Sequence, residues 1–335
     1  MSRQTDGTIT GDHGHRTAEA GGGSGGSRSR VEQRAAGTEA SGLGALTLVE
    51  WHLPGFGEEG PRCGEWYAES VCDSCAHLSL GTHDCGRRGC PNCWGGWAKR
   101  AAVARTVRLQ ARRLDEPPNY KRQSGHFTYS PGWTPQSVED IKELRREAAE
   151  TAKEKGLRGF DVVVHPFRTT EEANGLYEAA DADYGKWAWL RNEHPERMTF
   201  EAAEPLIRWS PHAHLIGLMS PDMDAGDDES DVWTLLRTFG AMNGKRDQES
   251  HEEVYGAYRY LLSHTGIHER EQFNAVTGYG DLSNTKFHEF RPSDGVMSVL
   301  EREVEEAAEA SLGDDEEADA PQREQPPRPK VADEV

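Results

Sequence analysis

The sequence predicts an α+β protein in which helices pack against an antiparallel sheet, preceded by a small cysteine-rich module. Two observations support this fold class. Short aromatic and β-branched runs alternate with helix-forming runs in the order strand, helix, strand, strand, helix, helix, which favours an antiparallel sheet with helices packed against it. In addition, all the cysteines lie between residues 63 and 93, ahead of the first of these elements.

Each element has its own local signal. The first strand ends at Pro131, and the third begins at Pro211, where the missing backbone N–H is tolerated. All three helices end at a Gly, a common stop signal. The predicted strands cover residues 125–131, 159–168 and 211–219, and the predicted helices cover 141–156, 232–244 and 252–266.

Composition divides the chain into four parts. Residues 1–45 are rich in Gly, Ser, Thr and Ala and predict a disordered arm. Residues 46–98 form the cysteine-rich module, and residues 99–290 hold the main strands and helices. Residues 291–335 combine acidic runs with Pro, so we expect an acidic disordered tail.

The overall charge is strongly acidic. A formal net charge of −20 is generally unfavourable for binding to nucleic acid, because phosphate and carboxylate groups repel each other. Only nine of the 38 basic residues are Lys, and with acids spread along the chain this indicates a protein adapted to high salt; an acidic protein from an ordinary host is the alternative. The chain contains neither a run of about 18 apolar residues nor an apolar signal segment. We therefore expect a cytoplasmic protein that does not contact membranes.

Two C-x-x-C motifs predict a zinc site. Cys72 and Cys75 form the first motif, Cys90 and Cys93 form the second, and fourteen residues separate them, close to the spacing of a zinc ribbon. Four thiolates fill the tetrahedral shell of Zn²⁺, which is typical of a structural site. The remaining candidates, which could form a second site or replace a ligand in the first, are Cys63, Cys85, His77 and His83.

A basic helix follows this module directly. Residues 87–122 contain ten Lys or Arg against two acidic residues. Arg105, Arg108 and Arg112 share one helical face, and a basic stripe in an acidic protein suits a DNA phosphate backbone. The alternative is a solvated helix whose arginines pair with neighbouring acids.

The third strand carries two histidines on one face. Because side chains two residues apart on a strand point the same way, His212 and His214 project side by side while Ala213 points away. Two imidazoles in this arrangement can chelate one divalent cation and leave positions open for phosphate oxygens. Two histidines that are simply satisfied by hydrogen bonds are the alternative.

Residues 252–266 hold Tyr255, Tyr258 and Tyr260 on one predicted helix. A nearby cation can lower the pKa of a phenol and polarise the phosphorus that it attacks. Tyr258 and Tyr260 point about 200° apart on a helix, so both cannot serve one site. Tyr260 shares its side with Gly256 and His264, a less apolar surface that suits a wet site, and Tyr260 is therefore the preferred nucleophile.

In combination, these motifs resemble the HUH endonuclease superfamily, specifically the rolling-circle replication initiators of haloarchaeal plasmids and pleomorphic viruses. HFTYSP resembles the first motif of that family, PHAHLIG the His-hydrophobe-His motif, and YRYLLSH the tyrosine motif, in the family's usual order. With the upstream cysteines, the resemblance spans about residues 63–270. The sequence departs from the pattern at Ser263, where relatives often have Lys.

The resemblance implies a ferredoxin- or RRM-like antiparallel sheet and a site-specific DNA endonuclease. His212 and His214 would bind Mg²⁺ or Mn²⁺, and Tyr260, with Tyr258 as second choice, would attack single-stranded origin DNA. The products would be a 5′-phosphotyrosine link and a free 3′-OH, and a host helicase and polymerase would be partners. A third metal ligand is expected, for which His165 and His264 are candidates.

Two other classes of function remain open at this point. A transposase or relaxase of the same superfamily would use the same residues. A DNA-binding regulator that is not an enzyme would use only the zinc module and the basic helix, residues 72–122.

Overall fold

A computed structural model describes most of the chain between residues 51 and 311. Its described residues are 51–71, 78–115, 123–182, 185–193, 205–220, 223, 232–240, 248–268, 273–290 and 292–311. The predicted arm 1–45 lies outside these residues, as does the part of the predicted tail from residue 312 onward.

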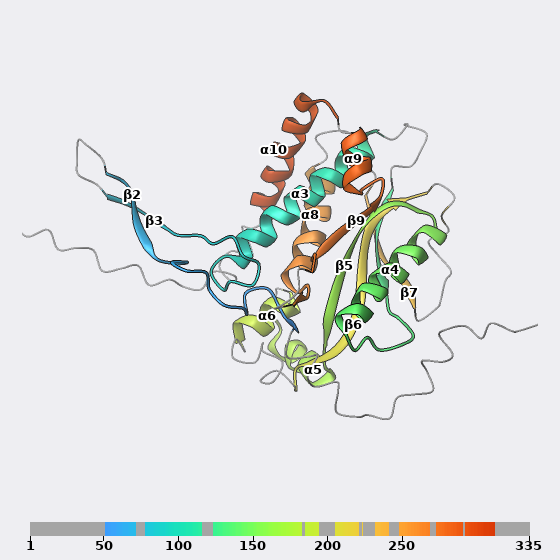
Figure 1. The fold of residues 1–335 in the computed structure, drawn as a ribbon, viewed down its shortest axis with the longest axis horizontal. Helices are drawn as coiled ribbons and strands as arrows, with labels where there is room; N and C mark the ends of the chain where they lie inside the picture. Colours follow the sequence, from blue (N-terminus) through green and yellow to red (C-terminus); the bar gives the residue numbers. More distant parts are fainter. Residues whose placement is uncertain are drawn as a thin grey trace, which may run out of the picture. The chain divides into compact units, whose positions relative to one another are not determined.

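The described part of the chain contains both helices and strands, in keeping with the predicted α+β class (Figure 1). The strands are β1 (Trp51–His52), β2 (Trp66–Val71), β3 (Leu78–Thr82), β4 (Ser124–Tyr129), β5 (Leu157–Thr169), β6 (Ile207–Met219), β7 (Trp233–Phe239), β8 (Ile267–His268) and β9 (Val276–Gly280). The helices are α3 (Trp94–Asp115), α4 (Val138–Glu154), α5 (Glu171–Ala180), α6 (Lys186–Glu193), α8 (Gln248–Ser263), α9 (Asn284–Phe290) and α10 (Asp294–Ala310). None of these helices is both long enough and apolar enough to cross a membrane.

The main sheet has five strands in the order β7-β4-β6-β5-β9, and every neighbouring pair is antiparallel. The expected antiparallel sheet is therefore confirmed. Strand β6, which carries the His-x-His motif, is central, with β4 on one side and β5 on the other. Two small antiparallel pairs, β1-β8 and β2-β3, complete the strand pairing among the described residues.

The two faces of the sheet are covered by different helices (Figure 1). On β6, Ala213 and Leu215 belong to one apolar core, together with the buried face of α4. The alternate residues Ile216 and Leu218 belong to a second core built with α3 and α8. This alternation is what a strand buried on both faces requires. His212 and His214 are in phase with Ile216, so they lie on the face that α8 covers.

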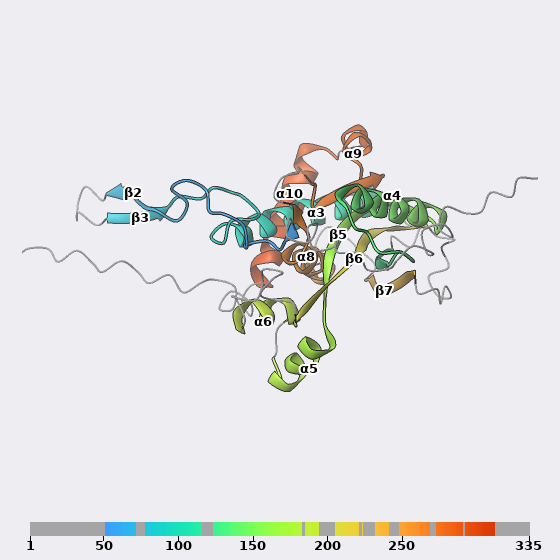
Figure 2. The ribbon, with the colours of Figure 1, turned by 60° about the horizontal axis from the view of Figure 1, so that its bottom comes forward.

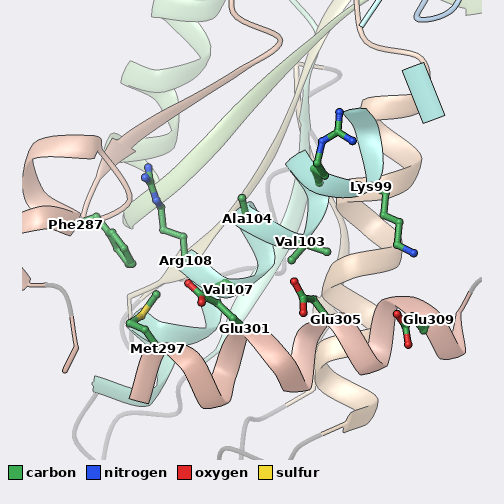
Figure 3. Close-up of a pocket in the computed structure, with 11 residues that line it drawn as sticks. Lys99, Val103, Ala104, Val107, Arg108, Phe287, Met297, Glu301, Glu305 and Glu309 are labelled. Atoms are coloured by element: carbon green, nitrogen blue, oxygen red, sulfur yellow. The ribbon is translucent and has the colours of Figure 1, made fainter. Parts of the chain in front are cut away.

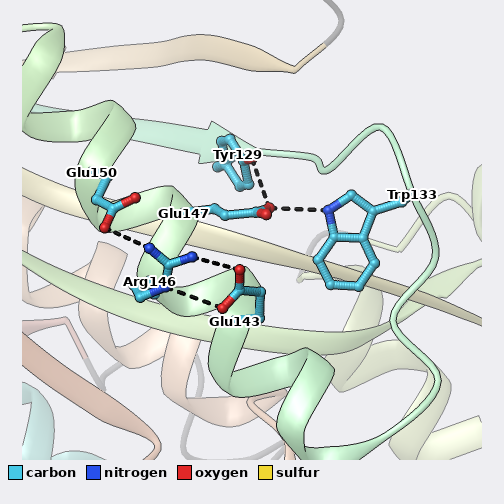
Figure 4. Close-up of polar contacts among 6 residues, drawn as sticks. All are labelled: Tyr129, Trp133, Glu143, Arg146, Glu147 and Glu150. Carbon is cyan, nitrogen blue, oxygen red and sulfur yellow. Dashed lines mark hydrogen bonds and ion pairs between the residues drawn. The ribbon is translucent and has the colours of Figure 1, made fainter. Parts of the chain in front are cut away.

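Helix α4 is held at its start by a cap and along its length by polar contacts. The Ser137 hydroxyl accepts a hydrogen bond from the backbone N–H of Asp140, which satisfies one of the first free N–H groups of the helix. Farther along, the Glu147 carboxylate accepts from the Tyr129 hydroxyl at 3.3 Å and from Trp133 Nε1 at 3.0 Å (Figure 4). These contacts tie α4 to the end of β4 and the loop that follows it.

Residues 232–244 were expected to form a helix, and this expectation is wrong. Trp233–Phe239 is strand β7, which pairs with β4 at the edge of the sheet. Trp233 and Phe239 are buried while most of the residues between them are exposed, and Trp233 stacks on Phe127 of β4. Pairing with an available strand edge therefore overrides the local helical spacing.

The expected disordered tail from residue 291 also needs correction. Residues Asp294–Ala310 form helix α10, whose buried side includes Leu300, Val304 and Ala307. The acidic residues between them mask this apolar stripe in a composition count. An amphipathic helix gains its stability from packing, which composition alone does not reveal.

Candidate metal centres and nucleophile

Four cysteines converge just before helix α3. They are Cys63, Cys85, Cys90 and Cys93, and their sulfurs all lie within 4.8 Å of one another. Cys63 Sγ is 3.3 Å from Cys90 Sγ and 3.1 Å from Cys93 Sγ, and Cys85 Sγ is 3.6 Å from Cys93 Sγ. The cluster belongs to a loop-rich segment whose backbone turns back on itself, with Cys63 N–H donating to Gly60 O and Cys93 N–H donating to Cys90 O.

This cluster fits a tetrahedral metal ion. With metal–sulfur bonds of about 2.3 Å, the sulfurs of a four-thiolate zinc site lie about 3.8 Å apart, slightly more than the spacing seen here. Burial raises the pKa of the Cys90 thiol and of the Cys93 thiol, so burial alone favours the protonated form of these groups. A bound cation deprotonates coordinating thiols outright. The four cysteines are therefore a donor set for a metal ion with no fifth position needed.

The predicted ligand set differs from this cluster in two members. Cys90 and Cys93 belong to it, but Cys72 and Cys75 lie outside the described residues. The other two members of the described cluster are Cys63 and Cys85, which are the additional cysteine candidates of the sequence. Helix α3 begins immediately after the last cysteine, since Trp94 N–H donates to Cys90 O and Trp97 N–H donates to Cys93 O. The cluster thus fixes where the basic helix starts.

A second cluster is formed by histidines from the two central antiparallel strands. His165 on β5 is the register partner of His212 on β6, and His214 follows two residues later on the same face. One ring nitrogen from each of these three residues lies within 4.8 Å of the others, and all three side chains are buried. The structure therefore brings the predicted pair together with His165, one of the two candidates for the third ligand.

Hydrogen bonds determine which nitrogen of two of these rings is free. His165 Nε2 is 2.9 Å from the Leu261 carbonyl oxygen, and His212 Nδ1 is 2.9 Å from the Ser210 carbonyl oxygen. A carbonyl can only accept, so each of these nitrogens carries the proton and the other nitrogen keeps its lone pair. His165 Nδ1 is indeed a buried atom with no hydrogen-bond partner. A buried lone pair left in this way is the observation expected at a metal site.

The histidines are held in the neutral form that binds metals. Burial lowers the pKa of His212 to about 4, with a further contribution from the charge of Arg168. Burial is also the main reason why the pKa values of His165 and His214 lie well below the ordinary value. Near neutral pH these imidazoles are unprotonated at one nitrogen and available to a cation.

Two more buried histidines border this cluster. His264 follows the end of α8, and its ring centroid lies 4.1 Å from that of His165. It is fixed there because Thr265 Oγ1 and Gly266 N both donate to Val164 O on β5, each at 3.1 Å. His126 on β4 is 2.9 Å from His214 through their ring nitrogens. His126 was not recognised as a site residue from the sequence, although it is the first residue of the motif HFTYSP.

The three tyrosines of α8 have different surroundings. Tyr255 and Tyr258 are 1% and 0% exposed and pack in the core, whereas Tyr260 is 43% exposed. The Tyr260 ring contacts His264 edge-on at a centroid distance of 4.5 Å. Partial burial, assisted by Tyr177, raises the pKa of the Tyr260 phenol. Tyr260 is therefore the tyrosine of this helix that is both accessible to a substrate and in contact with His264, which borders the histidine cluster.

Tyr258, the second choice for a nucleophile, is used inside the protein. Its hydroxyl donates to Asp161 Oδ2 at 2.8 Å, and the other oxygen of Asp161 pairs with Arg105 Nη1 at 2.8 Å. Burial and the charge of Asp161 raise the pKa of Tyr258 well above its ordinary value. This phenol therefore stays protonated and links α8 to β5.

Helix α6 lies beside this site. Trp187 stacks on the His264 ring at 5.0 Å with an interplanar angle of 14°, and Arg191 donates to the Ser263 carbonyl oxygen at 2.8 Å. Figure 2 shows α5 and α6 beyond the ends of β5 and β6, which they connect. No local sequence signal marks this role, because it depends on where the connection between the two strands folds back.

The three arginines predicted to bind DNA all have partners within the protein. Arg105 pairs with buried Asp161, and Arg112 pairs with Asp281 at 3.2 Å while its guanidinium lies over the Phe290 ring. Arg108 donates to the Leu282 carbonyl oxygen and to the Asn284 side chain. Arg105 and Arg112 thus have acidic partners of the kind that the alternative describes, whereas Arg108 donates to neutral oxygens.

A groove of about 590 Å³ lies between α3 and α10 (Figure 3). Lys99 and Arg108 of α3 stand on one side, and acidic residues of α10, such as Glu301 and Glu305, stand on the other. None of the residues that line it belongs to the cysteine or the histidine cluster. Opposite charges thus face each other here, which explains why an acidic segment packs beside a basic helix.

Comparisons of the chain with models of known protein families, with curated proteins and with solved structures find no match.

Proposed function

We propose that the protein is a metal-dependent endonuclease of the HUH type, which nicks single-stranded DNA and remains joined to the new 5′ end through Tyr260. The observation that carries this proposal is the cluster of three buried histidines, which His264 connects to Tyr260, the one exposed tyrosine of α8: the His264 ring contacts both His165 and Tyr260. In this role the protein would initiate rolling-circle replication, with origin DNA as substrate and a host helicase and polymerase as partners.

His165, His212 and His214 would hold Mg²⁺ or Mn²⁺, in a site whose open positions could accept phosphate oxygens. The bound cation would supply Lewis-acid polarisation of the scissile phosphate. His165 offers Nδ1 and His212 offers Nε2, because their other nitrogens donate to backbone carbonyls. The four-cysteine cluster would hold Zn²⁺ as a structural ion that fixes the beginning of α3.

Tyr260 is the proposed nucleophile. Its phenolic oxygen forms a bond to phosphorus while the bond from phosphorus to the 3′ oxygen breaks, and the leaving oxygen takes a proton from water to become a free 3′-OH. The phenolic proton passes to solvent, which the 43% exposure of the side chain permits. Burial raises the pKa of this phenol, and a cation held by the histidines would act in the opposite direction and favour loss of the proton.

The contacts of the basic helix favour an enzyme over a regulator that binds DNA through that helix alone. Arg105 and Arg112 form ion pairs with acidic residues of the protein. Fewer arginines of this helix are therefore free to bind phosphate than its sequence suggests. A transposase or relaxase would use the same histidines and tyrosine, and terminal inverted repeats flanking the gene would favour the transposase.

The proposal is tested with a pool of random single-stranded oligonucleotides, Mn²⁺ and high salt, followed by denaturing gel electrophoresis for a covalent adduct. The wild type should form an adduct, and Tyr260→Phe should form none while still binding the pool. Tyr67→Phe is the matched control, because Tyr67 is 40% exposed but lies on strand β2. An adduct on Tyr260→Phe, or peptide mapping of the nucleotide to Tyr255 or Tyr258, would contradict the assignment.

A further inference from the structure

His126 lies against the histidine cluster but has no part in the mechanism above. It belongs to β4, is 6% exposed, and its Nε2 is 2.9 Å from His214 Nδ1. The strand register explains the contact, because Thr128 is the partner of His214 and His126 is the partner of Ile216. His126 and His214 are therefore diagonal neighbours on the same face of the sheet, within reach of each other's side chains.

The direction of this hydrogen bond decides whether His214 can bind a cation. For His165 and His212 the partner is a carbonyl, which fixes the proton position. For His214 the partner is another imidazole, which can either donate or accept. If His126 Nε2 donates, the lone pair of His214 Nδ1 accepts that hydrogen bond and the proton of neutral His214 is on Nε2. Neither nitrogen of His214 is then free to bind a cation. If His214 Nδ1 donates, its Nε2 lone pair is free.

We infer that His126 is a positioning residue of the metal centre, because its Nε2 accepts a hydrogen bond from the Nδ1–H of His214 and so leaves His214 Nε2 free to bind a divalent cation. The inference rests on the proposed metal centre and adds a residue that does not itself touch the metal. All three ligands then follow one rule, in which one nitrogen donates to an acceptor of the protein and the other faces the cation. Acceptors of this kind set the orientation of a ligating ring and raise its basicity.

Two substitutions separate this role from simple packing. His126→Phe fills a similar volume but offers no acceptor, whereas His126→Gln places an amide oxygen near the original Nε2 position. We expect His126→Phe to weaken Mn²⁺ binding by about 10- to 100-fold, the usual effect of losing such a partner, and His126→Gln to stay within about threefold of the wild type. Mn²⁺ affinity is measured by titration calorimetry, and unfolding midpoints of the metal-free variants show whether each one folds.

A second measurement does not depend on metal binding. Long-range ¹H–¹⁵N couplings of histidine-labelled, metal-free wild-type protein should report His214 with its proton on Nδ1. A proton on Nε2 of His214 would overturn the inference, as would equal loss of Mn²⁺ affinity in folded His126→Phe and His126→Gln. If the wild type bound no Mn²⁺ at all, the proposed metal centre would fail, while the tautomer of His214 would still decide the direction of the bond.

Discussion

Replacing Arg105 distinguishes a structural arginine from one that binds DNA. The Arg105 guanidinium is 2.8 Å from Asp161 Oδ1, and the Asp161 side chain is completely buried. In Arg105→Met this carboxylate keeps the Tyr258 hydroxyl as a donor but loses its cation. Breaking a buried ion pair by removing one partner costs about 3 to 5 kcal/mol. Because the Arg105 side chain is 23% exposed and water can reach part of the pair, we expect about 3 kcal/mol.

Urea denaturation, followed by tryptophan fluorescence at constant salt, measures this loss. Arg112→Met is the matched control, since Arg112 lies on the same helical face but pairs with a carboxylate that is 31% exposed, and we expect it to cost about 1 kcal/mol or less. In an Asp161→Asn background, Arg105→Met should cost much less, because the buried charge is already gone.

The salt dependence of single-stranded DNA binding tests the alternative role, in which Arg105 contacts a phosphate. An arginine that neutralises a phosphate contributes about 0.7 to the slope of log affinity against log salt. We expect Arg105→Met to leave this slope unchanged. Unchanged stability together with a slope reduced by about 0.7 would refute the structural role and restore Arg105 as a DNA contact.

Two further predictions concern acid and zinc. Burial lowers the pKa of both His126 and His212 to about 4. As the pH falls below about 6.5, the unfolded chain therefore takes up protons before the folded protein does. We expect the free energy of unfolding to fall by about 1.4 kcal/mol per histidine per pH unit between about pH 6.5 and pH 4. Urea denaturation in chelator at pH 7 and pH 5 checks this, and equal stability at both would contradict it. Cys85→Ser should lose most of its zinc, whereas Cys72→Ser should keep about one ion per chain; elemental analysis showing the reverse would restore the C-x-x-C pair as ligands.

The strands of the sheet were predictable because their signals are local. Short runs of aromatic and β-branched residues located β4, β5 and β6, although β6 begins at Ile207, before the expected start at Pro211, and the spacing of α8 separated exposed Tyr260 from buried Tyr258. Strand β7 was misread because its residues fit a helix equally well until the edge of β4 is available for pairing. Helix α10 was missed for a related reason, since its partner α3 lies far away in sequence.

The ligand sets depended on contacts between distant segments. Six cysteines and two histidines were candidates for zinc, and spacing favoured the two C-x-x-C pairs. Cys63 and Cys85 also belong to the described cluster, but they were not preferred because neither has a C-x-x-C partner. The third ligand of the histidine cluster was open between His165 and His264. The pairing of β5 with β6 places His165 opposite His212, and no pattern within either strand specifies that register.

The buried Asp161 connects the fold to the reactivity of α8. Tyr258 and Tyr260 point about 200° apart on the helix, so a bond that holds Tyr258 against the sheet turns Tyr260 outward. Asp161 supplies that bond from β5, four residues before His165, and Arg105 of α3 compensates its charge. The same strand therefore holds the rotation of α8 through Asp161 and carries His165, a proposed metal ligand, four residues later. In the proposed nuclease, Tyr258 would therefore affect DNA cleavage through the position of Tyr260, while its own hydroxyl stays bonded to Asp161.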